Sequence, residues 1–182
     1  MNRRQALATL IALAAPAVSA AIDMQVSVQR RGNLLVVEAT LVAPVSQREA
    51  WSVLTDFDAM SGFVPNLEVS RVTARDGERL RVEQRGVARW GPLTQPYTMV
   101  REIELEPIAQ VRSQSVDGSP RQVRSLTHFT AVAGGTEIRH HIELDADTWM
   151  PDLLIEPFLR HEVREQFEAV VAEMQRRRAA VR

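Results

Sequence analysis

The sequence predicts an α+β domain, in which a strongly curved antiparallel sheet of seven or eight strands packs around one long C-terminal helix. Two short helices are expected after the first long strand, because Ser46 and Glu49 have the spacing of a helix capping box. Alternating apolar and polar residues then follow from residue 68 to residue 145, as expected for strands. Residues 151–178 repeat apolar side chains every three or four positions, which is typical of one face of a helix.

The chain begins with the features of a secretory signal peptide. Arg3 and Arg4 give a positive start, residues 6–17 are apolar, and residues 18–20 form a small-residue cleavage site. This apolar run is too short to span a bilayer. We therefore expect cleavage near Ala20, a single mature domain of residues 21–182, and a periplasmic or secreted location reached by the Sec or the twin-arginine route. The alternative is an uncleaved anchor or a plain N-terminal helix.

The composition excludes several kinds of chemistry. The chain has no cysteine, which rules out disulfides, thiol nucleophiles and thiolate metal ligands, and no lysine, which rules out Schiff bases. Without Arg3 and Arg4, 20 basic residues stand against 23 acidic ones, so nucleic acid is not an expected partner. One basic run, residues 176–178 with Arg182, can contact membrane lipid headgroups or simply complement the dipole at the helix end.

The first elements follow from local patterns. Residues 24–29 alternate apolar and polar side chains, which predicts a half-buried strand, and residues 34–42 form a longer strand that is apolar on both faces. An apolar stripe at residues 50–57 predicts the first helix. Asp58 can start a second short turn, and Pro65 ends it.

The rest of the sheet is expected from six further alternating segments. Turn-forming pairs separate several of them, at Asp76–Gly77, Gly91–Pro92, Asp117–Gly118 and Gly134–Gly135. The expected strands are residues 68–73, 79–90, 97–106, 110–116, 121–132 and 136–145.

The final helix leads to the prediction of a cavity. Its stripe of apolar residues runs from Leu159 to Met174, with a kink or a helix start expected at Pro157. A single helix, about 10 Å across, is too narrow to fill the concave side of a curved sheet. Small inward residues, Gly86 and Ala88, are expected to leave room rather than fill it. A fully packed core is the alternative.

Residues 44–72, PVSQREAWSVLTDFDAMSGFVPNLEVSRV, resemble the first helices of the START-like superfamily, also called SRPBCC. The resemblance is closest to the polyketide cyclase/dehydrase and coenzyme Q-binding branch. Gly134–Gly135–Thr136 and Trp149–Met150–Pro151 add to it, and it covers about residues 22–178. It implies the helix-grip fold shared with the birch-pollen allergen, with a ligand held between sheet and helix. Enzymes, lipid carriers and hormone receptors all use this fold, so the resemblance does not choose an activity.

Four polar residues interrupt faces that should point inward: Gln84, Arg101, His140, and one of Thr127 and His128. Arg101 can bind a carbonyl, phenol or carboxylate of a ligand, or it can lie at the rim or pair with a helix acid such as Glu162 or Glu165. His140 can act as an acid or base near neutral pH, or it can be a core histidine satisfied by the backbone.

The candidate site combines these polar residues with aromatic and apolar ones. His161 and Glu165 are interpreted as a solvated ion pair, since no third metal ligand is visible, and no metal or cofactor is expected. The predicted ligand-binding residues are Gln84, Trp90, Tyr97, Met99, Arg101, His140, Phe63 and Trp149.

These observations favour a periplasmic binding or carrier protein for a hydrophobic small molecule, such as a lipid, a quinone-like compound or an aromatic compound. The first alternative is a cyclase, dehydratase or aromatase that uses the same cavity, with His140 and Arg101 as catalytic residues. The second is a non-catalytic interaction module of the cell envelope.

Overall fold

The computed structural model describes residues 22–119, 122–145 and 152–181. The expected signal peptide and the Trp149–Met150 turn lie outside these ranges. Eight strands form one antiparallel sheet, in agreement with the predicted seven or eight, and their order is β1-β2-β8-β7-β6-β5-β4-β3. The strands are β1 (Met24–Arg31), β2 (Leu34–Ala43), β3 (Leu67–Asp76), β4 (Arg79–Trp90), β5 (Leu93–Glu106), β6 (Gln110–Ser119), β7 (Val123–Val132) and β8 (Gly135–Asp145).

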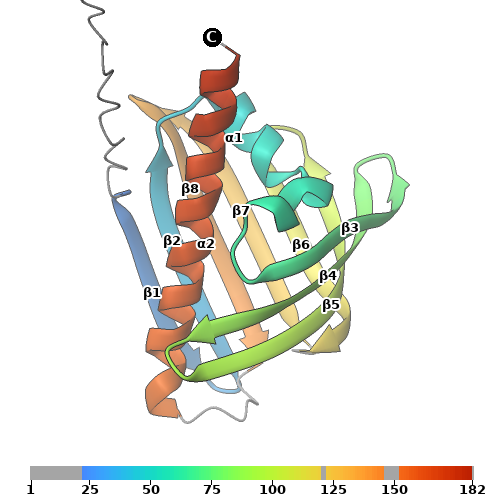
Figure 1. The fold of residues 1–182 in the computed structure, drawn as a ribbon, viewed down its shortest axis with the longest axis vertical. Helices are drawn as coiled ribbons and strands as arrows, with labels where there is room; N and C mark the ends of the chain where they lie inside the picture. Colours follow the sequence, from blue (N-terminus) through green and yellow to red (C-terminus); the bar gives the residue numbers. More distant parts are fainter. Residues whose placement is uncertain (1–21, 120–121, 146–151, 182) are drawn as a thin grey trace, which may run out of the picture.

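Two short helices and one long helix complete the fold. They are α1 (Gln47–Leu54), the 3-10 helix η1 (Phe57–Gly62) and α2 (Asp152–Ala180). The capping box is confirmed, because the Ser46 backbone N–H donates to the Glu49 carboxylate at 2.7 Å and the Ser46 hydroxyl accepts from the Glu49 backbone N–H. Figure 1 shows α2 lying along the sheet, with α1 and η1 beside its C-terminal half and β4 and β5 passing its N-terminal end.

Side chains bind main-chain groups at both edges of the sheet. At the β1 edge, the guanidinium groups of Arg160 and Arg164 on α2 donate to the backbone carbonyls of Val26 and Met24, the latter at 3.0 Å. At the β3 edge, the backbone N–H of Val72 donates to the Asp58 carboxylate at 2.7 Å. These contacts occupy main-chain groups that would otherwise be available to the strand of another chain.

The core lies between the concave face of the sheet and α2. The predicted helix stripe is buried from Val163 to Met174, against strand residues such as Leu41 and Ile138. A smaller apolar cluster lies nearer the N-terminal end of α2. There Ile155 and Phe158 pack with Leu35 and Ala88, and Trp90 lies against them.

Three details differ from the expectation. Asp117 and Gly118 do not form a turn but pair with β5 inside β6, where Gly118 has φ +107° and lies against the Thr98 carbonyl. A Cβ at Gly118 would lie 1.9 Å from that oxygen, so glycine serves a close strand contact there. In addition, β5 begins at Leu93 rather than at Tyr97, and α2 continues through Pro157, which is therefore not the start of the main helix.

Candidate functional site

A cavity of about 150 Å³ lies between the inner face of the sheet and the helices. Its helical side is mainly apolar, with Phe57 and Met60 from η1 and Phe167 and Val170 from α2, and Gln166 of α2 is the polar residue on that side. Its sheet side is largely polar. The strand residues that line it are Leu67, Gln84, Tyr97, Arg101, Val111, Ser113, Ser125, Thr127, Phe129 and His140.

The polar residues form a band across the sheet, and most of them are satisfied by one another. The Gln84 amide donates to the Ser70 hydroxyl at 3.1 Å, and the hydroxyls of Ser113 and Ser125 lie 3.2 Å apart. The Thr127 hydroxyl lies 2.7 Å from Nδ1 of His140. A band of this kind satisfies buried polar atoms without closing the cavity.

Arg101 is the exception in this band. It makes no hydrogen bond or ion pair with the described residues, and its Nε is buried without a partner. The proposed pairing with Glu162 or Glu165 is therefore not present. Part of the side chain is solvent-exposed, but burial of the charged group lowers the pKa of Arg101 to about 10, which still leaves it cationic at neutral pH. A partly buried cation with unused donors favours a ligand that brings an oxygen to the polar side of the cavity.

His140 lines the same cavity as Arg101, from β8, which β7 and β6 separate from β5 in the sheet, and is a neutral imidazole. Burial, helped by the nearby charge of Arg101, lowers the pKa of His140 to about 3. Its ring meets the Phe167 ring edge-to-face at 5.2 Å. Tyr97 is also neutral, because burial and then the charge of Glu162 raise its pKa to about 12, and its hydroxyl donates to the Asn66 carbonyl at 3.4 Å.

The two adjacent histidines of β8 should titrate very differently. His140 should show no change of charge between about pH 5 and pH 8, because its pKa is lowered from 6.5 to about 3. His141 points outward and is hydrogen-bonded to the Glu38 and Glu143 carboxylates, which raise its pKa, so it should titrate above 6.5. NMR titration of the imidazole resonances checks this, and a His140 midpoint inside that interval would contradict the desolvated environment.

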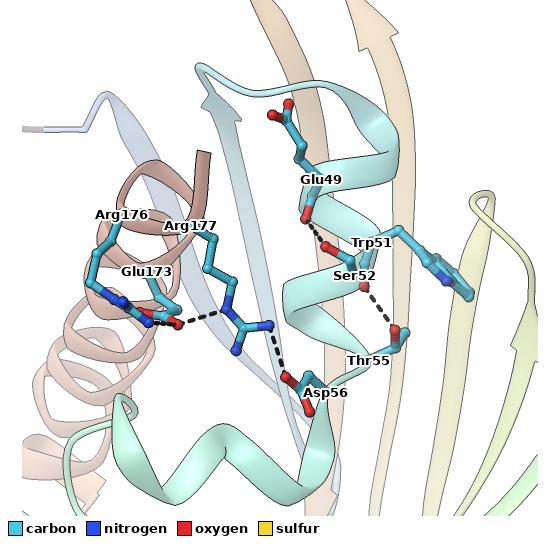
Figure 2. Close-up of polar contacts among 8 residues, drawn as sticks. All are labelled: Glu49, Trp51, Ser52, Thr55, Asp56, Glu173, Arg176 and Arg177. Atoms are coloured by element: carbon cyan, nitrogen blue, oxygen red, sulfur yellow. Dashed lines mark hydrogen bonds and ion pairs between the residues drawn. The ribbon is translucent and has the colours of Figure 1, made fainter. Parts of the chain in front are cut away.

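An ion-pair network of Asp56, Glu173 and Arg177, here called the latch, connects the α1–η1 part of the cavity wall to α2. Arg177 donates to Glu173 at 2.7 Å and to Asp56, between α1 and η1, at 2.8 Å. Figure 2 shows Arg177 between these two carboxylates, with Arg176 on the other side of Glu173. The Arg177 guanidinium also lies 5.7 Å from the centre of the Phe63 ring. Opening the α1–η1 side would have to break these contacts.

Replacing Glu173 with glutamine should destabilise the protein by roughly 1–3 kcal/mol at neutral pH, because the three charge-assisted hydrogen bonds that its carboxylate accepts from Arg176 and Arg177 are weakened. Its two arginine partners lower the pKa of Glu173 from 4.5 to about 2. The stabilisation is therefore complete above pH 4.5 and is lost as pH falls through 2. Urea unfolding at several pH values should show that the difference in free energy of unfolding between the wild type and Glu173→Gln shrinks as pH falls over this interval. Glu168→Gln, at an exposed position of α2, should have little effect on the free energy of unfolding at any pH.

The structure brings four of the predicted site residues together: Gln84, Tyr97, Arg101 and His140 all line the cavity. Three others do not line it. Trp90 packs in the smaller apolar cluster, Phe63 lies under Arg177, and Met99 is half-buried on β5. Trp149 lies outside the described residues.

The expectation that Gly86 and Ala88 leave room for a ligand is wrong. A Cβ at Gly86 would lie 2.0 Å from the Asn66 carbonyl oxygen and 2.6 Å from the Tyr97 hydroxyl, so the backbone of the η1–β3 connection fills that space. Ala88 is covered by the smaller apolar cluster. Neither residue lines the cavity.

The sequence left the choice between Thr127 and His128 open, and it did not indicate the cavity residues Ser113 and Ser125. Thr127 points inward and is buried, whereas His128 is exposed. Ser113 and Ser125 were overlooked because serine on a polar strand gives no signal of burial. Glu162 is buried outside the cavity, where it accepts from the Arg89 backbone N–H at 3.2 Å, and burial raises its pKa.

Among the described residues, one group of three side chains lies close enough together to hold a metal ion. His161, Glu162 and Glu165 place one donor atom each within 4.8 Å of one another. His161 and Glu165 are 4.0 Å apart and half-exposed, in agreement with the predicted solvated pair. This trio does not line the cavity, so the cavity itself offers no metal ligands beyond His140.

Comparison with known proteins decides the family. Residues 43–171 match the family described as polyketide cyclase/dehydrase and lipid transport. The chain belongs to this family. It is therefore a member of the START-like superfamily, as the resemblance predicted, and the eight-stranded sheet around a long C-terminal helix is the helix-grip fold. A search of curated protein sequences gave no match.

Solved structures of the START-like superfamily show the same fold. The chain is similar to the Zhui aromatase/cyclase from Streptomyces sp. R1128, with a TM-score of 0.68 and 16% identity over 79% of this chain and 95% of that one. It is similar to a STAR-related lipid transfer protein from Xanthomonas axonopodis, with a TM-score of 0.64 and 11% identity over 82% and 98%. Human StAR-related lipid transfer protein 5 gives a TM-score of 0.63 and 10% identity over 83% and 86%.

Proposed function

We propose that this member of the family binds and carries a hydrophobic small molecule with an oxygen-bearing polar end. The observation that carries the proposal is Arg101, a cation with a buried, unpartnered Nε in a cavity that is mainly apolar on its helical side. The apolar part of the ligand would lie against Phe57, Phe167 and Val170. Its oxygen would accept hydrogen bonds from Arg101, in the cavity that neutral His140 and Tyr97 also line.

The cavity is small for such a ligand. Its volume of about 150 Å³ is below the roughly 300–1,000 Å³ typical of sites for drug-sized molecules. It can therefore hold a ring or a head group, while a longer ligand requires the wall formed by α1 and η1 to move outward. The latch between Asp56, Arg177 and Glu173 holds this wall in the closed position.

Native mass spectrometry of the protein, purified from its own compartment without detergent, tests the proposal. We expect an added mass that denaturation releases and organic solvent extracts. Competition with a fluorescent apolar carboxylate provides the second readout. A protein that carries no extractable compound and binds no apolar probe would contradict the carrier function.

We also propose that the protein is exported and works outside the cytoplasm, as the signal-peptide pattern of residues 1–20 suggests. Fractionation of cells expressing the full chain should recover a shortened form in the periplasm or the medium. Among the described residues, no helix is long and apolar enough to cross a bilayer. Contact with lipid headgroups through the basic run stays a proposal, although Arg176, Arg177 and Arg178 each already pair with an acidic residue.

A second candidate is an enzyme of the cyclase, dehydratase or aromatase type. It is favoured by Arg101, a cation that can stabilise a developing oxyanion, in the cavity that neutral His140 also lines; the lowered pKa of His140 makes it a weak base at neutral pH. Turnover of an aromatic polyketide-like substrate that is lost in both His140→Ala and Arg101→Ala would support it. A protein that binds such a substrate but does not convert it would contradict the enzyme function and agree with the carrier function.

A further inference from the structure

The outer face of the sheet carries a groove of about 790 Å³, distinct from the cavity. Its floor is a row of residues that pair in register across neighbouring strands: Leu80, Ile103, Ser113 and Ser125. The side chains of these four residues point to the inner face of the sheet, away from the groove. The groove crosses β4 to β8, a distance of about 19 Å at the usual strand spacing.

Two rows of outward side chains form its walls. One wall consists of Arg79, Glu104, Arg112, Leu126 and His141, which are register partners in that order. The other consists of Arg81, Glu102, Gln114, Arg124 and Glu143. All ten residues line the groove.

Most acidic groups of the groove already have partners. Glu104 pairs with Arg79 at 3.3 Å, Glu143 lies 3.3 Å from His141, and Glu102 accepts from the Gln114 amide at 3.4 Å. Arg112 and Arg124 instead make no hydrogen bond or ion pair with any described residue. The carboxylates next to them in register, Glu104 and Glu143, are the ones engaged elsewhere. The middle of the groove is left with unused positive charge.

Arg112 and Arg124 lie on opposite walls and on adjacent strands. Arg112 pairs in register with Leu126, so Arg124 is its diagonal neighbour. Diagonal neighbours of this kind have Cβ atoms about 7–8 Å apart, which lets two long side chains reach one group between them. A carboxylate can be satisfied by one guanidinium. A tetrahedral oxyanion has oxygens that point in several directions and can accept from both walls at once.

We propose that the outer groove binds a phosphate group between Arg112 and Arg124. The phosphate belongs either to a soluble phosphate compound or to the headgroup of a phospholipid. The site is independent of the cavity and of the carrier function, because its side chains point away from the cavity on the opposite face of the same strands.

Titration of inorganic phosphate into the ¹⁵N-labelled protein tests this, with sodium chloride of equal ionic strength as the reference. We expect saturable shifts of the Arg112 and Arg124 Nε–H signals, and affinity that is roughly tenfold or more weaker in Arg112→Gln/Arg124→Gln. Arg139→Gln is the matched control, because Arg139 is an exposed arginine of the outer face that pairs with Glu137. It should bind phosphate like the wild type. Thermal unfolding of each variant confirms that the fold is intact.

Co-sedimentation with phosphatidylcholine vesicles, with and without phosphatidic acid, separates the two sources. Binding to phosphatidic acid vesicles that requires the same two arginines would support a headgroup. Binding of free phosphate without vesicle binding would support a soluble ligand. No saturable response in either experiment, a response that chloride reproduces, or one that survives in the double variant would overturn the proposal.

Discussion

Replacing Arg101 with methionine should stabilise the ligand-free protein and weaken ligand binding at the same time. The guanidinium is partly desolvated and its Nε has no partner, so an apolar side chain of similar length should raise the free energy of unfolding by about 1–3 kcal/mol. Ligand affinity should fall roughly 10–100-fold, because a hydrogen bond to a charged group is removed. A substitution that raises stability but lowers ligand affinity is typical of a residue that is retained for function.

Urea unfolding and a pair of fluorescent probes measure the two effects. The probes are an apolar carboxylate and its methyl ester, and the wild type should prefer the carboxylate. In Arg101→Met this preference should disappear, while affinity for the ester changes little. Arg139→Met, at an exposed position of the outer face, should leave both stability and preference unchanged. A variant that is destabilised and keeps the preference would show that Arg101 has a structural role only.

Replacing Phe167 with alanine should enlarge the cavity and cost about 3–5 kcal/mol of stability. Phe167 is 7% exposed, lines the cavity and holds the His140 ring edge-to-face at 5.2 Å. The added space adjoins the existing 150 Å³, so the variant should bind larger aromatic probes than the wild type does.

Met174→Ala provides the matched control for this prediction. Met174 is fully buried on the same helix but does not line the cavity, so its replacement should cost about 2–5 kcal/mol without changing the preferred probe size. Urea unfolding gives the stability change, and a series of one-ring and two-ring probes gives the size preference. A similar change of size preference in both variants would mean that general loosening of the core, rather than the cavity, determines which probes bind.

Much of the fold could be predicted because its signals are local. The capping box at Ser46 and Glu49 depends on residues three apart, and strand alternation shows directly that Gln84 and His140 share faces with apolar neighbours. The bounds of β4 are those expected, residues 79–90, because turn residues flank an uninterrupted alternating segment. The same alternation indicated that Arg101 faces inward.

The parts that could not be predicted depend on which strands and loops meet. Gly86 looks like empty space in the sequence, and only the fold shows that the Asn66 carbonyl fills it. Gly118 looks like a turn residue, and only pairing with β5 shows that it permits a close strand contact. The Ser113–Ser125 contact likewise requires the register between β6 and β7. No local pattern specifies these long-range partners.

The hydrogen bonds from Arg160 and Arg164 to β1 have a consequence for synthesis of the chain. They join β1, the first strand of the sheet, to α2, which follows all eight strands in the sequence, so they cannot form until α2 has emerged from the ribosome. Until then, the carbonyls of Met24 and Val26 remain open to pairing with another nascent chain. Newly made molecules should therefore be most prone to aggregate before α2 packs against β1, and a holdase chaperone would give its greatest benefit during that interval.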